Sequence, residues 1–132
     1  VLGNLYSKRD WGHASDYVVA IHKILQQKKS DDYVIATGKE YTIKEFVKKA
    51  AEKLKLNLRW SGKGMKEHAL DENGKIIIKI SKTYFRPLEV EYLKGDATKA
   101  RKVLKWKPKI DLDGLIDEMI IHEKSLLLYP KT

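Results

Sequence analysis

Residues 33–46 read YVIATGKEYTIKEF, and this stretch decides how the chain passes from strand to helix. Its first part, residues 33–37, is rich in β-branched and aromatic side chains and is stopped by Gly38, which predicts a short strand buried on both faces. Its second part, residues 42–45, is a capping box, in which a threonine hydroxyl and a glutamate carboxylate each satisfy a free backbone amide. A helix is therefore expected to start here, with its apolar face at Val47, Ala50, Ala51 and Leu54.

Three further helices are predicted around this centre. Apolar residues at helical spacing indicate one helix over residues 15–27, capped by Ser15 or Asp16. Asp96 is placed to cap a second, short helix, and Asp111 to cap the last one. The apolar residues of the first and last of these helices are Val18, Ile21, Ile24 and Leu25, and Leu112, Ile116, Met119 and Ile120.

Two more strands are predicted between the helices. Residues 56–60 alternate apolar and polar side chains, and residues 75–80 are rich in isoleucine. The stretch between them, residues 61–74, is expected to be a loop in which Asn73 and Gly74 favour a tight hairpin turn. The fold class that follows is a small α/β lobe, mostly helical with short strands.

Length and composition limit the class of protein. The 132 residues, 42% of them hydrophobic, suffice for one core, so one globular unit is the default. No apolar run approaches the roughly 20 residues that cross a bilayer. No secretory signal is visible, and cysteine is absent. We therefore expect a cytoplasmic protein without membrane spans, disulfides or thiolate metal sites.

The formal net charge of +9 indicates affinity for an anion, such as a nucleotide, a nucleic acid or an acidic protein. The lysines, however, are spread through nearly every segment, as they are on solvated helix faces. Nucleic acid is therefore not the expected partner.

The sequence lacks a recognisable catalytic centre. Its four histidines lie far apart, and none forms a His-Glu-x-x-His metal motif. No two glycines have the Gly-x-x-Gly spacing of a phosphate-binding loop, and no tyrosine precedes a lysine by four residues, as in the proton-transferring pair of short-chain dehydrogenases. We therefore predict no catalytic, cofactor-binding or metal-binding residue in this chain.

Three charged residues differ from the general lysine background, because they lie in irregular segments beside aromatic residues or proline. They are Arg9, near Trp11, and the pair Arg86 and Glu89, which flank Pro87 and Leu88. A guanidinium group suits a diphosphate, and a carboxylate can accept two hydrogen bonds from a ribose diol or a guanine edge. The same residues could instead form a structural ion pair, and spacing does not decide between the two.

At these residues the sequence resembles the GDP-mannose 4,6-dehydratases, in a region that runs from Val1 to about Leu126. The most specific run is Arg9-Asp10-Trp11-Gly12-His13-Ala14. The matching stretches, in the order in which that family has them, are residues 2–5, 8–14, 16–18, 33–38, 84–87, 89–90, 95–100 and 104–108.

The resemblance implies that residues 1–132 are the carboxy-terminal, substrate-binding domain of an extended short-chain dehydrogenase/reductase. Such a lyase converts GDP-mannose to GDP-4-keto-6-deoxymannose, on the way to GDP-fucose, with a tightly bound NADP. The cofactor and the catalytic residues would belong to a Rossmann domain that this chain lacks, so the fragment alone is expected to be inactive. By the same resemblance, Arg9 would contact the nucleotide diphosphate, Arg86 and Glu89 would hold the GDP portion, and the parent enzyme would be a homo-oligomer.

Two other interpretations stay open. The chain could be a stand-alone basic module that binds a nucleotide or a nucleic acid without catalysis, which would give strong salt dependence and little base preference. It could also be the equivalent lobe of a dehydratase or epimerase for another sugar nucleotide, against which only the resemblance at residues 84–90 argues.

Overall fold

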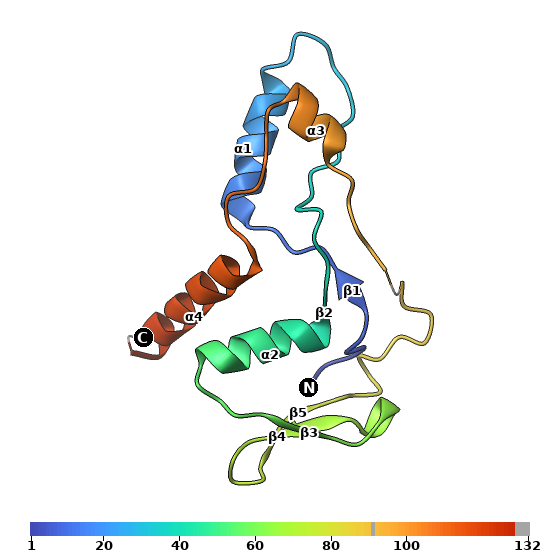
Figure 1. Cartoon of the computed structure of the whole chain (residues 1–132), viewed down its shortest axis with the longest axis vertical. Helices are drawn as coiled ribbons and strands as arrows, with labels where there is room; N and C mark the ends of the chain where they lie inside the picture. Colours follow the sequence, from blue (N-terminus) through green and yellow to red (C-terminus); the bar gives the residue numbers. More distant parts are fainter. Residues whose placement is uncertain (91, 129–132) are drawn as a thin grey trace. The chain divides into compact units, whose positions relative to one another are not determined.

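The computed structural model of the chain describes residues 1–90 and 92–128. The chain divides into two compact units, each built from two separate stretches. The first unit comprises Val1–Lys8 and Tyr41–Tyr92, and the second comprises Arg9–Glu40 and Leu93–Thr132. Figure 1 shows their helices and strands, including the two-residue strand β1 (Lys8–Arg9) in which the chain leaves the first unit.

The first unit contains the predicted capping box. Strand β2 (Tyr41–Thr42) leads directly into helix α2 (Ile43–Lys53). The hydroxyl of Thr42 accepts a hydrogen bond from the Glu45 amide at 3.0 Å, and the Glu45 carboxylate accepts one from the Thr42 amide at 2.6 Å. The prediction of a helix start at this point is confirmed, because the box uses only neighbouring residues and needs no tertiary partner.

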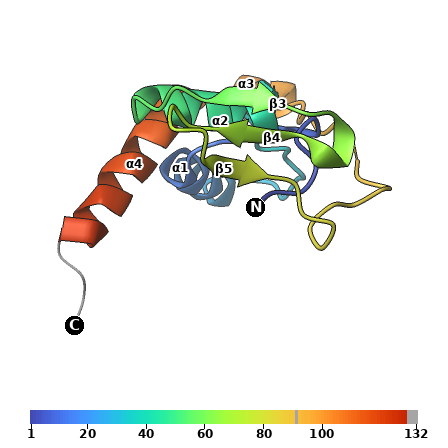
Figure 2. The same cartoon turned by 90° about the horizontal axis from the view of Figure 1, so that it is seen from below.

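The chain continues from α2 into a three-stranded antiparallel sheet (Figure 2), with β4 between β3 and β5. The strands are β3 (Arg59–Ser61), β4 (His68–Leu70) and β5 (Ile76–Lys79). Strands β4 and β5 meet at the predicted hairpin turn, where Gly74 has φ +80°. A left-handed conformation of this kind is readily adopted by glycine, so the predicted turn is confirmed, although Asn73, unlike Gly74, has no positive φ.

Two predictions in this unit need correction. The expected loop over residues 61–74 contains β4 and a 3₁₀ turn, η1 (Gly64–Lys66). The strand expected over residues 56–60 instead begins at Arg59, and Leu56 is 42% exposed. Residues 68–70 carry no strong strand signal of their own, and they become a strand because β3 and β5 pair with them from both sides.

The second unit has its core between α1 (Ala14–Leu25) and α3 (Thr98–Val103), which Figure 1 shows together. Helix α3 has only six residues, and a helix this short gains most of its stability from packing rather than from intrinsic helix propensity. The buried cluster consists of Ala20, Ala36, Ala97, Ala100, Leu104 and Trp106.

The start of α1 differs from the prediction. The N-cap residue is His13, whose Nδ1 accepts from the Ser15 amide at 3.1 Å. Asp16 is buried, and its Oδ2 accepts from the amides of Lys109 and Ile110 at 2.8 and 2.9 Å. Its carboxylate therefore joins α1 to a segment more than 90 residues later in the chain, and it is not available to cap its own helix.

The two capping aspartates predicted further along the chain, Asp96 and Asp111, do accept hydrogen bonds at helix starts. The Asp111 carboxylate accepts from the Gly114 amide at 3.0 Å at the start of α4 (Leu112–Leu128), as predicted. The Asp96 carboxylate accepts from the Thr98 amide at 2.9 Å, although the N-cap residue of α3 is Ala97. Both aspartates thus satisfy helix-terminal amides, which is the role that their position indicated.

The strand predicted at residues 33–37 is not formed within the described part of the chain. The segment has no regular secondary structure; Val34 is 54% exposed, whereas Ala36 is 6% exposed and Tyr33 and Ile35 pack against the core. The Thr37 amide donates to the Asp10 carboxylate at 3.0 Å rather than to a neighbouring strand. A β-prone sequence becomes a strand only where another strand offers it a backbone ladder.

Part of the apolar series predicted on α1 faces outward. Val18, Ile21 and Leu25 are 62, 55 and 75% exposed, whereas Tyr17 and Ile24 pack against the core cluster. On α4, Leu112 and Ile116 are buried as expected, but Met119 is 48% exposed. We call Val18, Ile21 and Leu25 the outer stripe of α1.

Within the described ranges, four helices and short strands make up the structure, so the predicted α/β class is confirmed. No helix in the described part of the chain has the length and apolar character needed to span a membrane.

Candidate functional site

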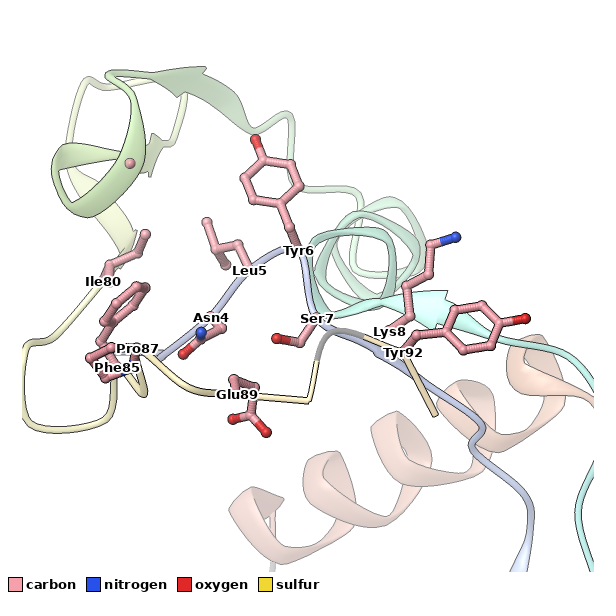
Figure 3. A pocket seen from close by; sticks show the side chains of 11 residues that line it. Asn4, Leu5, Tyr6, Ser7, Lys8, Ile80, Phe85, Pro87, Glu89 and Tyr92 are labelled. Carbon is pink, nitrogen blue, oxygen red and sulfur yellow. The ribbon is translucent and has the colours of Figure 1, made fainter. Parts of the chain in front are cut away.

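A pocket of about 560 Å³ lies in the first unit (Figure 3). Its lining comes from the first eight residues of the chain, from η1 and from the segment after β5. The lining residues are Asn4, Leu5, Tyr6, Ser7, Lys8, Gly64, Ile80, Phe85, Pro87, Glu89 and Tyr92.

Backbone pairing builds one wall of this pocket. Leu2 forms a parallel bridge with Ile80, in which the Leu2 amide donates to the Lys79 carbonyl and the Ser81 amide donates to the Leu2 carbonyl, each at 2.9 Å. On the other side, the Lys44 amide at the start of α2 donates to the Leu5 carbonyl at 2.8 Å. The first residues of the chain are thus fixed between the sheet and the helix of the same unit.

Two tight turns build the opposite wall. The Ser81 carbonyl accepts from the amides of Tyr84 and Phe85 at 3.2 and 2.9 Å. The Glu89 amide then donates to the Arg86 carbonyl at 3.2 Å and closes a four-residue turn. Pro87 occupies the second position of that turn, which the fixed φ of proline favours.

This second turn brings two of the predicted site residues together. Arg86 and Glu89 stand at its two ends, with Glu89 half-buried in the pocket lining and Arg86 exposed beside it. The pairing of these two residues could be anticipated from their spacing around Pro87. The sequence could not predict which of the two residues faces the pocket, because that depends on how the turn is anchored.

The third predicted residue, Arg9, belongs to the second unit, where the residue after it is firmly held. The Asp10 carboxylate accepts from the Thr37 amide at 3.0 Å, from the Thr37 hydroxyl at 2.5 Å and from the Gly38 amide at 2.8 Å. Arg101 adds a hydrogen bond to the Thr37 carbonyl at 2.9 Å. The backbone beside the half-buried Arg9 is therefore fixed to residues 37–38.

The pocket also contains groups that the sequence did not single out. Asn4 bonds the backbone of Arg86, and the Lys8 ammonium lies 5.8 Å from the centre of the Tyr92 ring, within cation–π range. No sequence signal pointed to them, because the pairs Asn4–Arg86 and Lys8–Tyr92 each join the two ends of the first unit.

A charged cluster borders the pocket at Tyr6. The Lys44 ammonium lies 2.5 Å from Glu67 Oε1, and the Tyr6 hydroxyl donates to the same oxygen at 3.0 Å. Burial raises the pKa of Glu67, but the hydrogen bonds from Lys44 and Tyr6 outweigh it and leave that pKa below its usual value. The hydrogen bond to Glu67 raises the pKa of Lys44. Both groups are therefore held in their charged forms.

At the start of helix α2, the residues present do not fit the phosphates of a nicotinamide cofactor. The strand-to-helix passage from β2 to α2 contains no glycine, and the side chains of Thr42 and Glu45 already occupy amides at the helix start that a phosphate would need. Among residues 1–90 and 92–128, no group of His, Asp and Glu side chains could hold a metal ion. The pocket lining offers groups suited to binding, namely the Lys8 ammonium, the Glu89 carboxylate and the aromatic faces of Tyr6, Phe85 and Tyr92.

Curated relatives match nearly all of the chain. It is 45% identical over 126 residues to GDP-mannose 4,6 dehydratase 2 of Caenorhabditis elegans, which covers 96% of this chain and 33% of that protein. It is 42% identical over 127 residues to the human GDP-mannose 4,6 dehydratase, again covering 96% of this chain and 34% of that protein. The chain thus spans about a third of the length of these relatives.

Solved structures share the fold at low sequence identity. The RMD protein of Pseudomonas aeruginosa, complexed with NADPH, gives a TM-score of 0.70 at 17% identity, covering 94% of this chain and 35% of that one. The dTDP-glucose 4,6-dehydratase of Bacillus anthracis, in complex with NAD, gives 0.66 at 19% identity, covering 96% and 35%.

A family model matches most of the chain, and this match decides to which protein family the chain belongs. The family model described as GDP-mannose 4,6 dehydratase covers residues 1–119. Together with the relatives above, this match shows that the chain belongs to the GDP-mannose 4,6-dehydratase family and corresponds to a carboxy-terminal part of its members.

Proposed function

We propose that this chain is the substrate-binding domain of an enzyme that converts GDP-mannose to GDP-4-keto-6-deoxymannose. Its task is to hold the GDP-sugar while the rest of the enzyme carries out the chemistry. The observation that carries the proposal is the family match over residues 1–119, combined with a closed turn that holds Arg86 and Glu89 at the edge of a pocket.

Arg86 in the first unit would bind phosphate, and Arg9 offers the same chemistry in the second unit. The planar guanidinium donates several hydrogen bonds in a fork that matches two phosphate oxygens, and its charge is permanent. Arg86 is exposed and therefore has access to solvent and to a ligand, whereas Arg9 is half-buried.

Glu89 would select the nucleoside. Its carboxylate has acceptor capacity for two donors on one ligand edge, which fits either the ribose diol or the N1–H and amino group of guanine. These two assignments differ in what they predict. Contact with the base edge would distinguish guanine from uracil, whereas contact with the ribose would not.

The dehydration needs groups that this chain does not supply. In our proposal NADP, which provides reversible hydride transfer, and the acid–base residues belong to the remainder of the enzyme. The relatives, about three times as long as this chain, and the NADPH-bound and NAD-bound structural neighbours support this division of labour. A cytoplasmic location remains a prediction from the sequence.

The outer stripe of α1 supports a further part of the proposal, that the chain works in contact with other protein. Val18, Ile21 and Leu25 recur on one side of α1, and each is more than half exposed. Exposed apolar surface of this kind commonly marks an interface. We assign the contact to the Rossmann domain of the parent enzyme, which we propose to be a homo-oligomer.

Titration of the ¹⁵N-labelled chain with nucleotides tests the proposal. We expect GDP and GDP-mannose to shift amide resonances of residues 84–90, and Arg86→Ala to weaken the binding. Lys82→Ala is the matched control, because it removes an exposed cation of the same segment that lies outside the turn formed by residues 86–89. A response to a short DNA duplex alone, strongly dependent on salt, would contradict the proposal in favour of a basic module.

Analogues of GDP separate the two roles open to Glu89. Inosine diphosphate lacks the amino group of guanine, and 2′-deoxy-GDP lacks one ribose hydroxyl. If Glu89 binds the base edge, Glu89→Gln should abolish the preference of the chain for GDP over inosine diphosphate. If it binds the ribose, the same variant should abolish the preference for GDP over the deoxynucleotide. Retention of both preferences in Glu89→Gln would show that this residue does not touch the nucleoside.

A further inference from the structure

Asn4 makes an unusual contact with one of the proposed binding residues. Its amide Nδ2 donates to the Arg86 carbonyl at 2.8 Å, and the Arg86 amide donates to Asn4 Oδ1 at 2.9 Å. A carboxamide offers a donor and an acceptor side by side, so it can satisfy both backbone groups of one residue. The two residues are 82 positions apart in the chain.

The contact falls on the residue that begins the binding turn. The Arg86 carbonyl that receives the Asn4 amide also receives the Glu89 amide, at 3.2 Å. One side chain thus fixes the backbone from which Arg86 projects and anchors the hydrogen bond that sets the position of Glu89. Figure 3 shows Asn4 and Glu89 among the side chains around the pocket.

The residue before Asn4 makes the approach possible. A Cβ added at Gly3 would lie 2.3 Å from the Tyr84 carbonyl oxygen, so only glycine allows the two stretches to come this close. The backbone bonds of Leu2 to Lys79 and Ser81 hold the same stretch independently of Asn4. Loss of the Asn4 side chain should therefore loosen the turn at residues 86–89 without detaching residues 1–5.

We propose that Asn4 is a positioning residue, which sets the affinity for a guanosine diphosphate by holding the Arg86–Glu89 turn in its binding conformation. The inference rests on the function proposed for Arg86 and Glu89. It assigns no ligand contact to Asn4 itself. A ligand that must first order a turn and its side chains binds more weakly than one that meets them already in place.

Two variants separate positioning from simple packing. Asn4→Ala removes both hydrogen bonds. Asn4→Asp keeps the shape and the acceptor for the Arg86 amide, but it places a carboxylate oxygen against the Arg86 carbonyl, where the donor was. Asn57→Ala is the matched control, since Asn57 is an exposed asparagine of the same unit whose amide donates to Glu72, away from the pocket.

The experiment measures amide hydrogen exchange without ligand and GDP affinity by NMR titration, on the 132-residue chain. We expect faster exchange at Arg86 and Glu89 in Asn4→Ala and at Glu89 in Asn4→Asp, with binding between about twofold and tenfold weaker in both variants. In the Asn4 variants, amide exchange in helix α2 should match that of the wild type. In Asn57→Ala, amide exchange at Arg86 and Glu89 should match that of the wild type. Wild-type affinity for GDP in either Asn4→Ala or Asn4→Asp would overturn the inference about Asn4 but not the proposed function. Absence of GDP binding by the wild-type chain would overturn the proposed function and, with it, the role of Asn4 in affinity.

Discussion

Replacement of Asp16 by alanine should strongly destabilise the second unit. The carboxylate is 5% exposed and accepts two backbone hydrogen bonds, from Lys109 and Ile110. The Asp16 carbonyl also accepts from the indole of Trp106, which is 2% exposed. Asp16 therefore accounts for three hydrogen bonds that join the segment from 106 to 110 to α1.

The magnitude follows from the contacts that are lost. A hydrogen bond to a charged group contributes about 1.5–3 kcal/mol, and the two bonds here share one oxygen, so the lower end applies to each. We expect Asp16→Ala to lower the free energy of unfolding by about 3 kcal/mol, which is on the order of a hundredfold in the unfolding equilibrium. Asp16→Asn, which keeps an acceptor oxygen but loses the charge, should cost about 1 kcal/mol.

Urea unfolding followed by circular dichroism measures this loss, provided that the slope against denaturant stays the same among the variants. Asp32→Ala provides the matched control, because it removes an exposed aspartate from the same unit. Amide exchange at Lys109 and Ile110 gives a local readout, which should accelerate only in the Asp16 variants. A loss below about 1 kcal/mol for Asp16→Ala would refute the reasoning, since both amides would then have found other partners.

Two further predictions concern the pH dependence of stability and the exposed apolar stripe of α1. Because the pKa of Glu67 is lowered in the fold, its contribution to stability is present above the unfolded value and is lost as the pH falls through the folded one. Urea unfolding between pH 7 and pH 3 should therefore show a smaller acid loss in Glu67→Gln than in the wild type, and equal losses would argue against a stabilising pair with Lys44. Changing Val18, Ile21 and Leu25 together to serine should reduce binding of an apolar dye and self-association of the isolated chain, with little change in the urea midpoint. A large fall in that midpoint would mean that the outer stripe of α1 packs within the unit.

Local signals in the sequence determined the features that neighbouring residues can complete among themselves. The capping box at Thr42 and Glu45 works within a single turn of chain, and Gly74 supplies a left-handed φ that its own backbone permits. The family could also be identified, because the runs that resemble it extend over most of the chain. Arg86 and Glu89 stood out for the same reason, since their position around Pro87 is a property of four consecutive residues.

Only the tertiary structure decided what depends on partners far away in the chain. Residues 33–37 have the composition of a strand, but the Asp10 carboxylate satisfies the Thr37 amide, and no described strand pairs with them. No sequence pattern singled out Asn4, because its proposed role depends on the fold, which places its carboxamide against the backbone of Arg86. The physical reason is the same in each case. Hydrogen-bonding groups must be satisfied, but which partner satisfies them is set by the packing of the whole unit and not by the order of residues.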